Sequence, residues 1–184
     1  MYSRLILSKC YFFIFLLLFL CKNSNVLAQE NTFKTIRDLF NEAVKDQDNR
    51  DEFYSYLEDI TLQNPTVTAY KASAKALKAQ DAWNPINKLS FLKEAGTLFE
   101  TAIVKEPNNI ELRFLRFSVQ FNTPRWLGMS DELNEDKNVI IAYINDYKKL
   151  NIDDGVLNWI QTFMIESGYC TESEIETIQA AKTN

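Results

Sequence analysis

The sequence predicts an all-α protein in which about eight helices stack as antiparallel hairpins. Apolar residues recur three and four positions apart along nearly the whole chain, which is the spacing of one helix face, and no strand-like alternation persists. Breaks that contain proline or asparagine interrupt this pattern at residues 64–65, 83–85, 107–109 and 122–124. Because the turns between the segments are short, neighbouring helices are expected to pack as antiparallel pairs.

The first 28 residues have the features of a cleaved secretory signal peptide. Two basic residues precede an unbroken apolar run at positions 11–20, and the segment ends in Val-Leu-Ala28. This run is about half as long as the roughly 20 residues that a membrane-spanning helix needs. We therefore expect cleavage after Ala28. The mature chain, residues 29–184, is expected to form one domain that is periplasmic or secreted.

The composition of the mature chain excludes several kinds of chemistry. The absence of histidine removes Ser-His-Asp and Cys-His catalysis and histidine metal sites, and we expect no cofactor. Cys170 is the one cysteine after the signal, so no internal disulfide forms, and a partly buried, inert thiol is expected rather than an intermolecular link. Removing the three basic residues of the signal changes the formal charge from −5 to about −8. This charge disfavours nucleic acid and anionic membranes as general partners.

Four helices are expected in the first half of the mature chain. Phe33, Ile36 and Phe40 share one face of the first helix, which a polar cluster ends. The second helix stops at an Asn-Pro pair, the third is rich in alanine, and the fourth follows the interruption around Trp83. The expected ranges are about 32–46, 51–63, 66–81 and 88–105.

Four more helices are expected in the second half, and their ends have recognisable signals. Asp153 and Asp154 can cap the seventh helix, and Gly168 can end it in the left-handed conformation. Thr171 and Glu174 form a capping box for the last, short helix. The expected ranges are about 109–121, 131–150, 154–168 and a short segment after residue 171, with a loop at 125–130.

One helix pair, residues 67–109, resembles a tetratricopeptide repeat. Tyr70, Ala74 and Leu77 occupy the bulky, small and apolar positions of its first helix. The second helix matches the pattern at Ala95, Phe99, Ala102 and Pro107. The linker around residues 83–85 makes the pair about nine residues longer than the usual 34, and the flanking pairs are degenerate. The resemblance implies stacked hairpins that bind partners on their surface and carry no reaction chemistry.

The resemblance also implies a binding groove, because the first helices of successive pairs line a concave face. On that register the candidate binding residues are Lys71, Lys75, Lys78, Arg113 and Arg116, with Asn122 and Arg125 just beyond. Basic side chains pair well with carboxylates, so the expected partner is a protein or peptide with an acidic segment or a C-terminal carboxylate. The alternative is that the lysines form a solvated helix face and that the arginines pair with acids such as Glu111.

The loop at 125–130 is a second candidate. Trp126, which is followed closely by Gly128, can form a binding knob between two helices. The alternative, which we favour, is that Trp126 and Leu127 plug the gap between neighbouring hairpins and that Gly128 supplies a positive φ. By the same argument, the linker with Trp83 and Pro85 is expected to fold over the core.

The sequence leaves three functions open. The favoured one is a scaffold or adaptor that holds a protein or peptide in the cell envelope. The second is a structural subunit of an envelope complex whose apolar first or last helix docks onto a neighbour, which an exposed stripe of Phe33 and Phe40 would support. The third is an enzyme, because the segment at 165–169 is similar to the Glu-Ser-Gly-aromatic segment of lytic transglycosylases, which cleave peptidoglycan with one glutamic acid, here Glu166. Only 15 residues follow Tyr169, too few for the rest of that family's segments. We therefore expect no enzymatic activity.

Overall fold

A computed structural model describes residues 29–181, and the expected signal peptide at 1–28 lies outside the described residues. The described part contains eight α-helices, three short 3₁₀ helices and no β-strand. The prediction of an all-α fold with about eight helices is confirmed. No helix of this part combines the length and the apolar character needed to cross a membrane.

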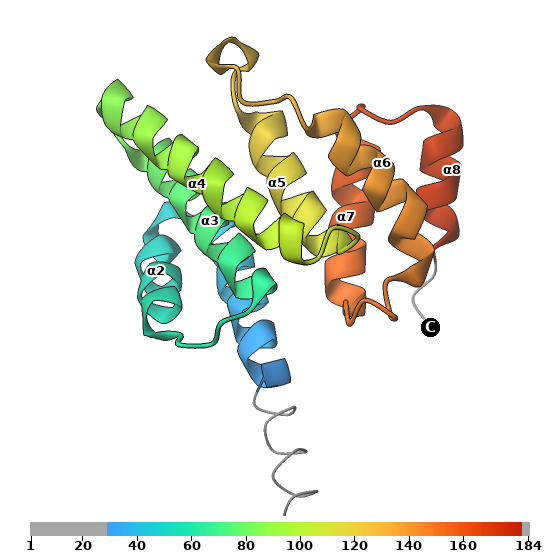
Figure 1. Cartoon of the computed structure of the whole chain (residues 1–184), viewed down its shortest axis with the longest axis horizontal. Helices are drawn as coiled ribbons and strands as arrows, with labels where there is room; N and C mark the ends of the chain where they lie inside the picture. Colours follow the sequence, from blue (N-terminus) through green and yellow to red (C-terminus); the bar gives the residue numbers. More distant parts are fainter. Residues whose placement is uncertain (1–28, 182–184) are drawn as a thin grey trace, which may run out of the picture.

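The helices follow one another with short connections (Figure 1). The N-terminal helix covers residues 29–45 of the described part. The next elements are η1 (Gln47–Asn49), α2 (Arg50–Asp59), α3 (Pro65–Asp81) and α4 (Pro85–Lys105). They are followed by α5 (Ile110–Asn122), η2 (Arg125–Leu127), α6 (Leu133–Tyr143), η3 (Ile144–Asp146), α7 (Asp154–Glu166) and α8 (Glu172–Ala180).

The Asn-Pro pairs start helices rather than merely ending them. Asn64 and Asn84 are N-caps whose side chains accept hydrogen bonds from the second residue of the following helix, and proline takes the first helical position in each case. Proline fits there because the first N–H of a helix has no partner within the helix. As a result α4 begins three residues before the expected residue 88.

The sixth helix is shorter than expected, whereas the capping signals near the C-terminus are confirmed. The helix expected over 131–150 ends at Tyr143 and gives way to η3 and a turn with Asn151 at φ 56°. This turn places Tyr147 and Ile152 in the second core, where both are buried. The capping box of α8 is present, and Gly168 has the predicted left-handed φ of 66°.

Two hydrophobic cores flank α5. The first joins the N-terminal helix, α2, α3 and α4, and Leu112 and Leu115 of α5 contribute to it. The second joins α6, η3, α7 and α8, and Ile110, Phe114 and Phe117 contribute from the other faces of α5. Figure 1 shows the long α3–α4 hairpin on one side of α5 and the helices from α6 to α8 on the other. α5 is therefore the element around which both halves are packed.

The α3–α4 hairpin is the most extensively packed pair, followed by α5 and α6. Ala95, Phe99 and Ala102, which the sequence pattern selected, are all buried on the α3 side of the first core. The opposite end of the hairpin differs from the expectation, because Trp83 is 99% exposed. The prediction that this linker folds over the core is wrong: the linker is a tight turn, and α4 starts at once behind it.

The capping box of α8 gives a prediction for pH dependence. Hydrogen bonds from the Lys137 ammonium and from the backbone N–H of Thr171 lower the pKa of Glu174 below its unperturbed value of 4.5. The pKa of Glu174 is therefore lower in the folded state than in the unfolded state. The ionised carboxylate contributes its full stabilisation above pH 4.5, and this contribution is lost as the pH falls through the folded-state pKa. We expect Glu174→Gln to reduce stability at neutral pH and to flatten its decline under acid, as measured by urea unfolding at a series of pH values. Glu176→Gln, an exposed change on the same helix, is the control, and equal curves for both variants would contradict the prediction.

Candidate functional site

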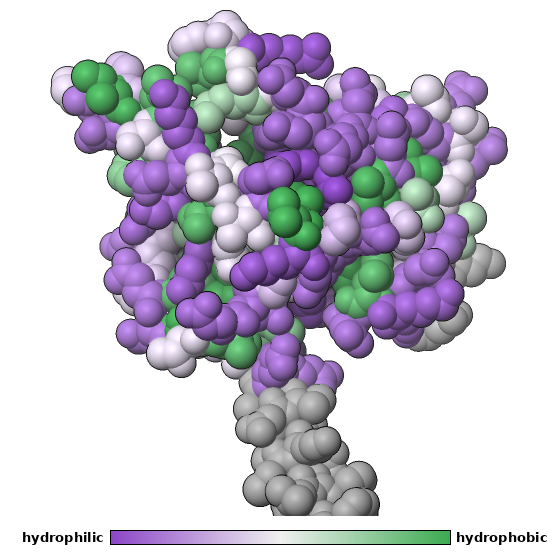
Figure 2. Space-filling view, viewed as in Figure 1, coloured by the Kyte–Doolittle hydropathy of each residue, from purple (hydrophilic) through white to green (hydrophobic). Residues whose placement is uncertain are grey.

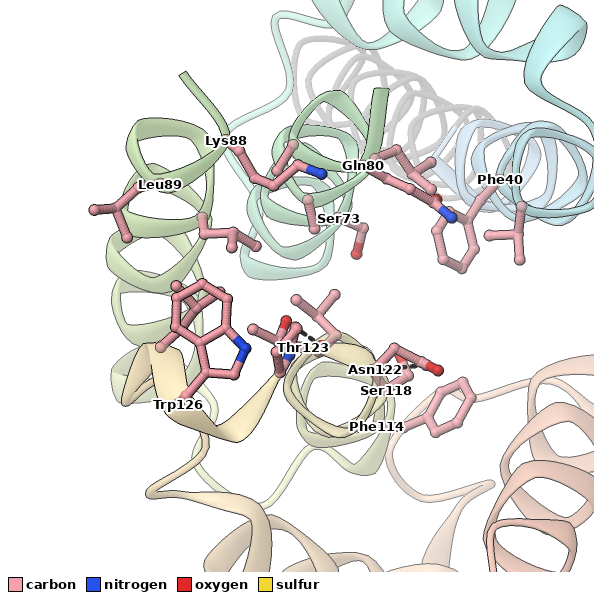
Figure 3. Close-up of a pocket in the computed structure, with 18 of the residues that line it drawn as sticks. Phe40, Ser73, Gln80, Lys88, Leu89, Phe114, Ser118, Asn122, Thr123 and Trp126 are labelled. Atoms are coloured by element: carbon pink, nitrogen blue, oxygen red, sulfur yellow. Dashed lines mark hydrogen bonds between the residues drawn. The ribbon is translucent and has the colours of Figure 1, made fainter. Parts of the chain in front are cut away.

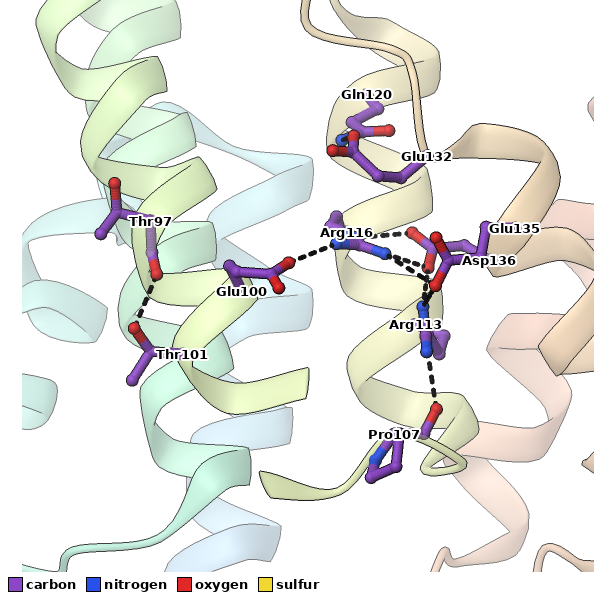
Figure 4. A network of polar contacts seen from close by, with 10 residues as sticks. All are labelled: Thr97, Glu100, Thr101, Pro107, Arg113, Arg116, Gln120, Glu132, Glu135 and Asp136. Carbon is purple, nitrogen blue, oxygen red and sulfur yellow. Dashed lines mark hydrogen bonds and ion pairs between the residues drawn. The ribbon is translucent and has the colours of Figure 1, made fainter. Parts of the chain in front are cut away.

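The two arginines predicted to line a basic groove are buried in the protein. Arg113 and Arg116 are almost inaccessible, and both point from α5 toward α6, where Asp136 is 0% exposed (Figure 4). Arg116 binds Asp136 through two hydrogen bonds, Nε to Oδ2 at 2.8 Å and Nη2 to Oδ1 at 2.6 Å. Arg113 reaches the same carboxylate at 3.0 Å and also donates to Glu135 at 2.6 Å.

This cluster of Arg113, Arg116 and Asp136 is structural. Burial by itself would lower the pKa of Arg116, but its hydrogen bonds and charge interaction with Asp136 outweigh burial and raise it. Arg116 therefore remains charged. Both arginines are tied to α6, and Arg116 also donates to Glu100 of α4 at 3.2 Å. The alternative expectation, that these arginines pair with acidic residues, is what the structure shows. Glu111, the example given for that pairing, binds Arg37 instead.

The predicted lysines also lie outside a groove. Lys75 forms an ion pair with Glu94 of α4 at 2.6 Å. Lys71 donates to the carbonyl oxygen of Ile60, after α2, at 3.4 Å, and the Lys78 ammonium lies over the Tyr54 ring of α2, 4.6 Å from its centroid. The three lysines thus point to two different neighbouring helices. The predicted basic groove is corrected: none of these five cations lines the larger groove that the structure has, and Arg116, which Asp136 holds, borders only a smaller hollow between α4 and α5.

That groove is an apolar hollow of about 710 Å³ (Figure 3). It opens between the end of the α3–α4 hairpin and the end of α5, and the N-terminal helix, η2 and α7 complete its walls. Among its lining residues are Phe40, Leu77, Leu89, Phe114 and Trp126. Two predicted binding residues, Asn122 and Trp126, line it, and Arg125 is exposed beside it.

The hydroxyl groups that line the groove donate their hydrogen bonds to the protein backbone. Ser73, Ser118 and Thr123 each donate their hydroxyl to a carbonyl oxygen three or four residues earlier, at 2.8 to 3.1 Å. This local bonding leaves mainly hydrocarbon on the surface of the groove. The surface that the groove presents to a ligand is therefore mainly apolar.

Lys88 is the one charged residue among those that line the groove. It is exposed near the start of α4 and takes part in none of the ion pairs found in residues 29–181. Figure 3 shows its ammonium group on the hairpin side of the groove, across from Trp126 and Thr123. An apolar ligand bound here would meet one positive charge.

The loop after α5 differs from the favoured expectation. Trp126 does not plug a gap between hairpins, because it is 82% exposed, although it borders the groove. Gly128 has the expected positive φ, 64°, and ends the η2 turn. The turn holds the Trp126 indole at the mouth of the groove. This position agrees with the alternative expectation, in which Trp126 forms a binding knob.

The remaining chemical candidates, Glu166 and Cys170, line neither of the two hollows described. Glu166 is the last residue of α7 and is exposed, and it lines neither the groove nor a smaller hollow of about 350 Å³ between α4 and α5. The Cys170 thiol is free and partly buried, and burial together with the nearby Glu174 charge raises its pKa. Within the described residues, no group of acidic and cysteine side chains is arranged to hold a metal ion.

Sequence reasoning missed most of the groove for a definite reason. It selected charged residues on the first helices, whereas the groove uses the apolar and small residues beside them, such as Ser73, Ala76 and Leu77. A usable signal exists in α5, where apolar residues occur on every side of the helix. A helix of that kind is enclosed, so its charged residues must be paired rather than exposed.

Comparison of the chain with protein-family models, curated proteins and solved structures finds no match.

The arginine cluster predicts a large difference between two neighbouring carboxylates. Asp136→Ala leaves two buried guanidinium groups without their shared partner and is expected to lower the free energy of unfolding by about 3–5 kcal/mol. Glu135→Ala removes a carboxylate that binds Arg113 from an exposed position (60% accessible) and is expected to cost less than about 1 kcal/mol. Urea unfolding measures both values, and similar losses would contradict the assigned roles.

Proposed function

We propose that this protein is a non-enzymatic scaffold or adaptor of the cell envelope that holds an apolar segment of a partner protein in the groove. The observation that carries the proposal is the groove itself, about 710 Å³ in volume, with an apolar lining and a single charged residue. This volume lies within the range of about 300–1,000 Å³ that is typical of ligand sites. The walls include α3 and α5, the helices that the tetratricopeptide resemblance associates with peptide binding.

Lys88 specifies the chemistry at one end of the ligand. An ammonium group without an ion pair at the edge of an apolar surface favours a ligand with one carboxylate and an otherwise apolar body. The C-terminal segment of a protein with apolar final residues has this composition. We therefore take such a C-terminal segment as the ligand.

The two other functions have less support in the described residues. A structural subunit would expose a stripe of Phe33 and Phe40, but both are partly buried and pack against the first core. Phe40 also contacts the rings of Phe53 and Tyr70, with centroids 5.7 and 5.3 Å away. A peptidoglycan-cleaving enzyme would need a cleft at Glu166, which lines neither described hollow.

Filling the groove is expected to abolish peptide binding. Ser118 lies on the α5 wall, so the ring of Ser118→Phe would occupy the hollow, and burial of that ring would maintain the stability of the protein. Binding is measured by fluorescence anisotropy with short apolar peptides that end in a free carboxylate or in an amide. We expect the parent protein to bind the carboxylate form more tightly. Lys88→Glu is expected to weaken that form about fivefold and to affect the amide form less.

Lys105→Glu is the matched control, because Lys105 is an exposed lysine at the opposite end of the same helix. It changes the net charge of the protein as Lys88→Glu does but lies far from the groove along α4. The proposal fails if neither peptide form binds the parent protein, or if Ser118→Phe binds both as the parent does. Equal effects of the two lysine substitutions would remove the role of Lys88.

A further inference from the structure

Two turns project at the same end of the molecule, and each carries an exposed tryptophan. The hairpin tip, residues 82–89, connects α3 to α4, and the loop tip, residues 124–129, follows α5 and contains η2. Both stand at the upper end in Figure 1. Trp83 of the hairpin tip is 99% exposed, and Trp126 of the loop tip is 82% exposed. Residues of both tips line the same groove, so the tips are neighbours.

Neither the fold nor the groove accounts for the apolar residues of the hairpin tip. Trp83 and Ile86, which is 77% exposed, belong to neither core and do not line the groove. Single exposed apolar residues are ordinary, but here three large ones lie on two adjoining tips. Figure 2 shows apolar side chains at this end, around the start of α4 and over the η2 loop. Because the tips are convex, they fit a soft, extended apolar surface better than a small ligand.

The two tips carry charge of the opposite sign to the protein as a whole. Residues 82–89 and 124–129 contain Lys88 and Arg125 and no acidic residue, and the nearest acidic residues along the chain, Asp81, Glu94 and Asp131, lie outside them. The mature chain as a whole carries an excess of acidic residues. A protein with this asymmetry approaches a negatively charged surface with its basic end first.

We propose that the two tips dock on the surface of a lipid bilayer that contains anionic lipids. Trp83, Ile86 and Trp126 enter the interfacial layer, where tryptophan is favoured because its ring is apolar and its N–H finds polar partners. Arg125 contacts the lipid phosphates, and the positive charge of Lys88 at the mouth of the groove adds to the attraction. Docking is peripheral, since no helix of the described residues can span a bilayer. The repulsion between an acidic protein surface and an anionic membrane concerns the rest of the surface, not this end.

The test measures partition of the chain from Gln29 onward, which contains every residue of both cores. It is sedimented with phosphatidylcholine vesicles and with vesicles that also contain phosphatidylglycerol. We expect partition on the anionic vesicles that weakens as salt is added, because salt screens exposed charges. The double substitution Trp83→Ser and Ile86→Ser is expected to lower this partition at least about tenfold. Both residues lie outside the groove, so peptide binding stays unchanged.

Val104→Ser is the matched control, because Val104 is an exposed aliphatic residue (69%) at the other end of α4. It is expected to partition as the parent does, and thermal unfolding of all variants should coincide, since the substituted side chains are exposed. The proposal is overturned if the parent binds neither kind of vesicle, or if the double variant partitions as the control does. It is also overturned if the parent forms a dimer without vesicles and the double variant is monomeric. The tips would then bind a second copy of the chain.

Discussion

The structure depends on satisfying the charges of a helix that is enclosed on all sides. Eight consecutive residues of α5, from Ile110 to Phe117, are buried, and three of them are charged. A buried charge without a partner is strongly destabilising, so each must meet an opposite charge from a surrounding helix. Glu111 takes two hydrogen bonds from Arg37 of the N-terminal helix, at 2.8 and 2.6 Å, and one from Tyr70 of α3 at 2.7 Å. The two arginines of α5 meet α6 in the same way, so one helix sets the positions of three others.

The groove follows from this arrangement and from a difference in helix length. α4 has 21 residues and α5 has 13, which at about 1.5 Å per residue leaves the start of α4 about 12 Å beyond the end of α5. The hairpin therefore projects past the core, and the η2 loop rises beside it. The wall that α5 contributes contains Ser118, Val119 and Asn122, beyond its charged, buried segment. The groove is apolar because the residues that line it are mostly apolar and the paired cations of α5 lie outside it.

Local signals in the sequence predicted the helices well and the site poorly. The caps at Thr171 and Gly168 depend on residues within a few positions of each other, so their pattern is visible in the sequence. The partner of Arg116 lies 20 residues away on the next helix, and that of Arg37 lies 74 residues away. Nothing in helical spacing identifies such pairs, and the register that the tetratricopeptide resemblance implied therefore placed buried arginines on a surface. Burial of α5 had to be known before its charges could be interpreted.

The groove and the two tips are surfaces with different physical roles, and the exposed side chains of Trp83 and Trp126 lie on the tips. The groove is concave and offers an apolar interior next to one ammonium group, whereas the tips are convex and offer tryptophan rings beside basic residues. Because Lys88 and Trp126 belong to both, the mouth of the groove opens between the tips. A protein docked by its tips would hold that mouth at the depth of the lipid headgroups, where apolar peptide ends are at least partly shielded from water. The two proposals are thus independent in their tests but compatible in space, and a ligand held at the membrane surface satisfies both.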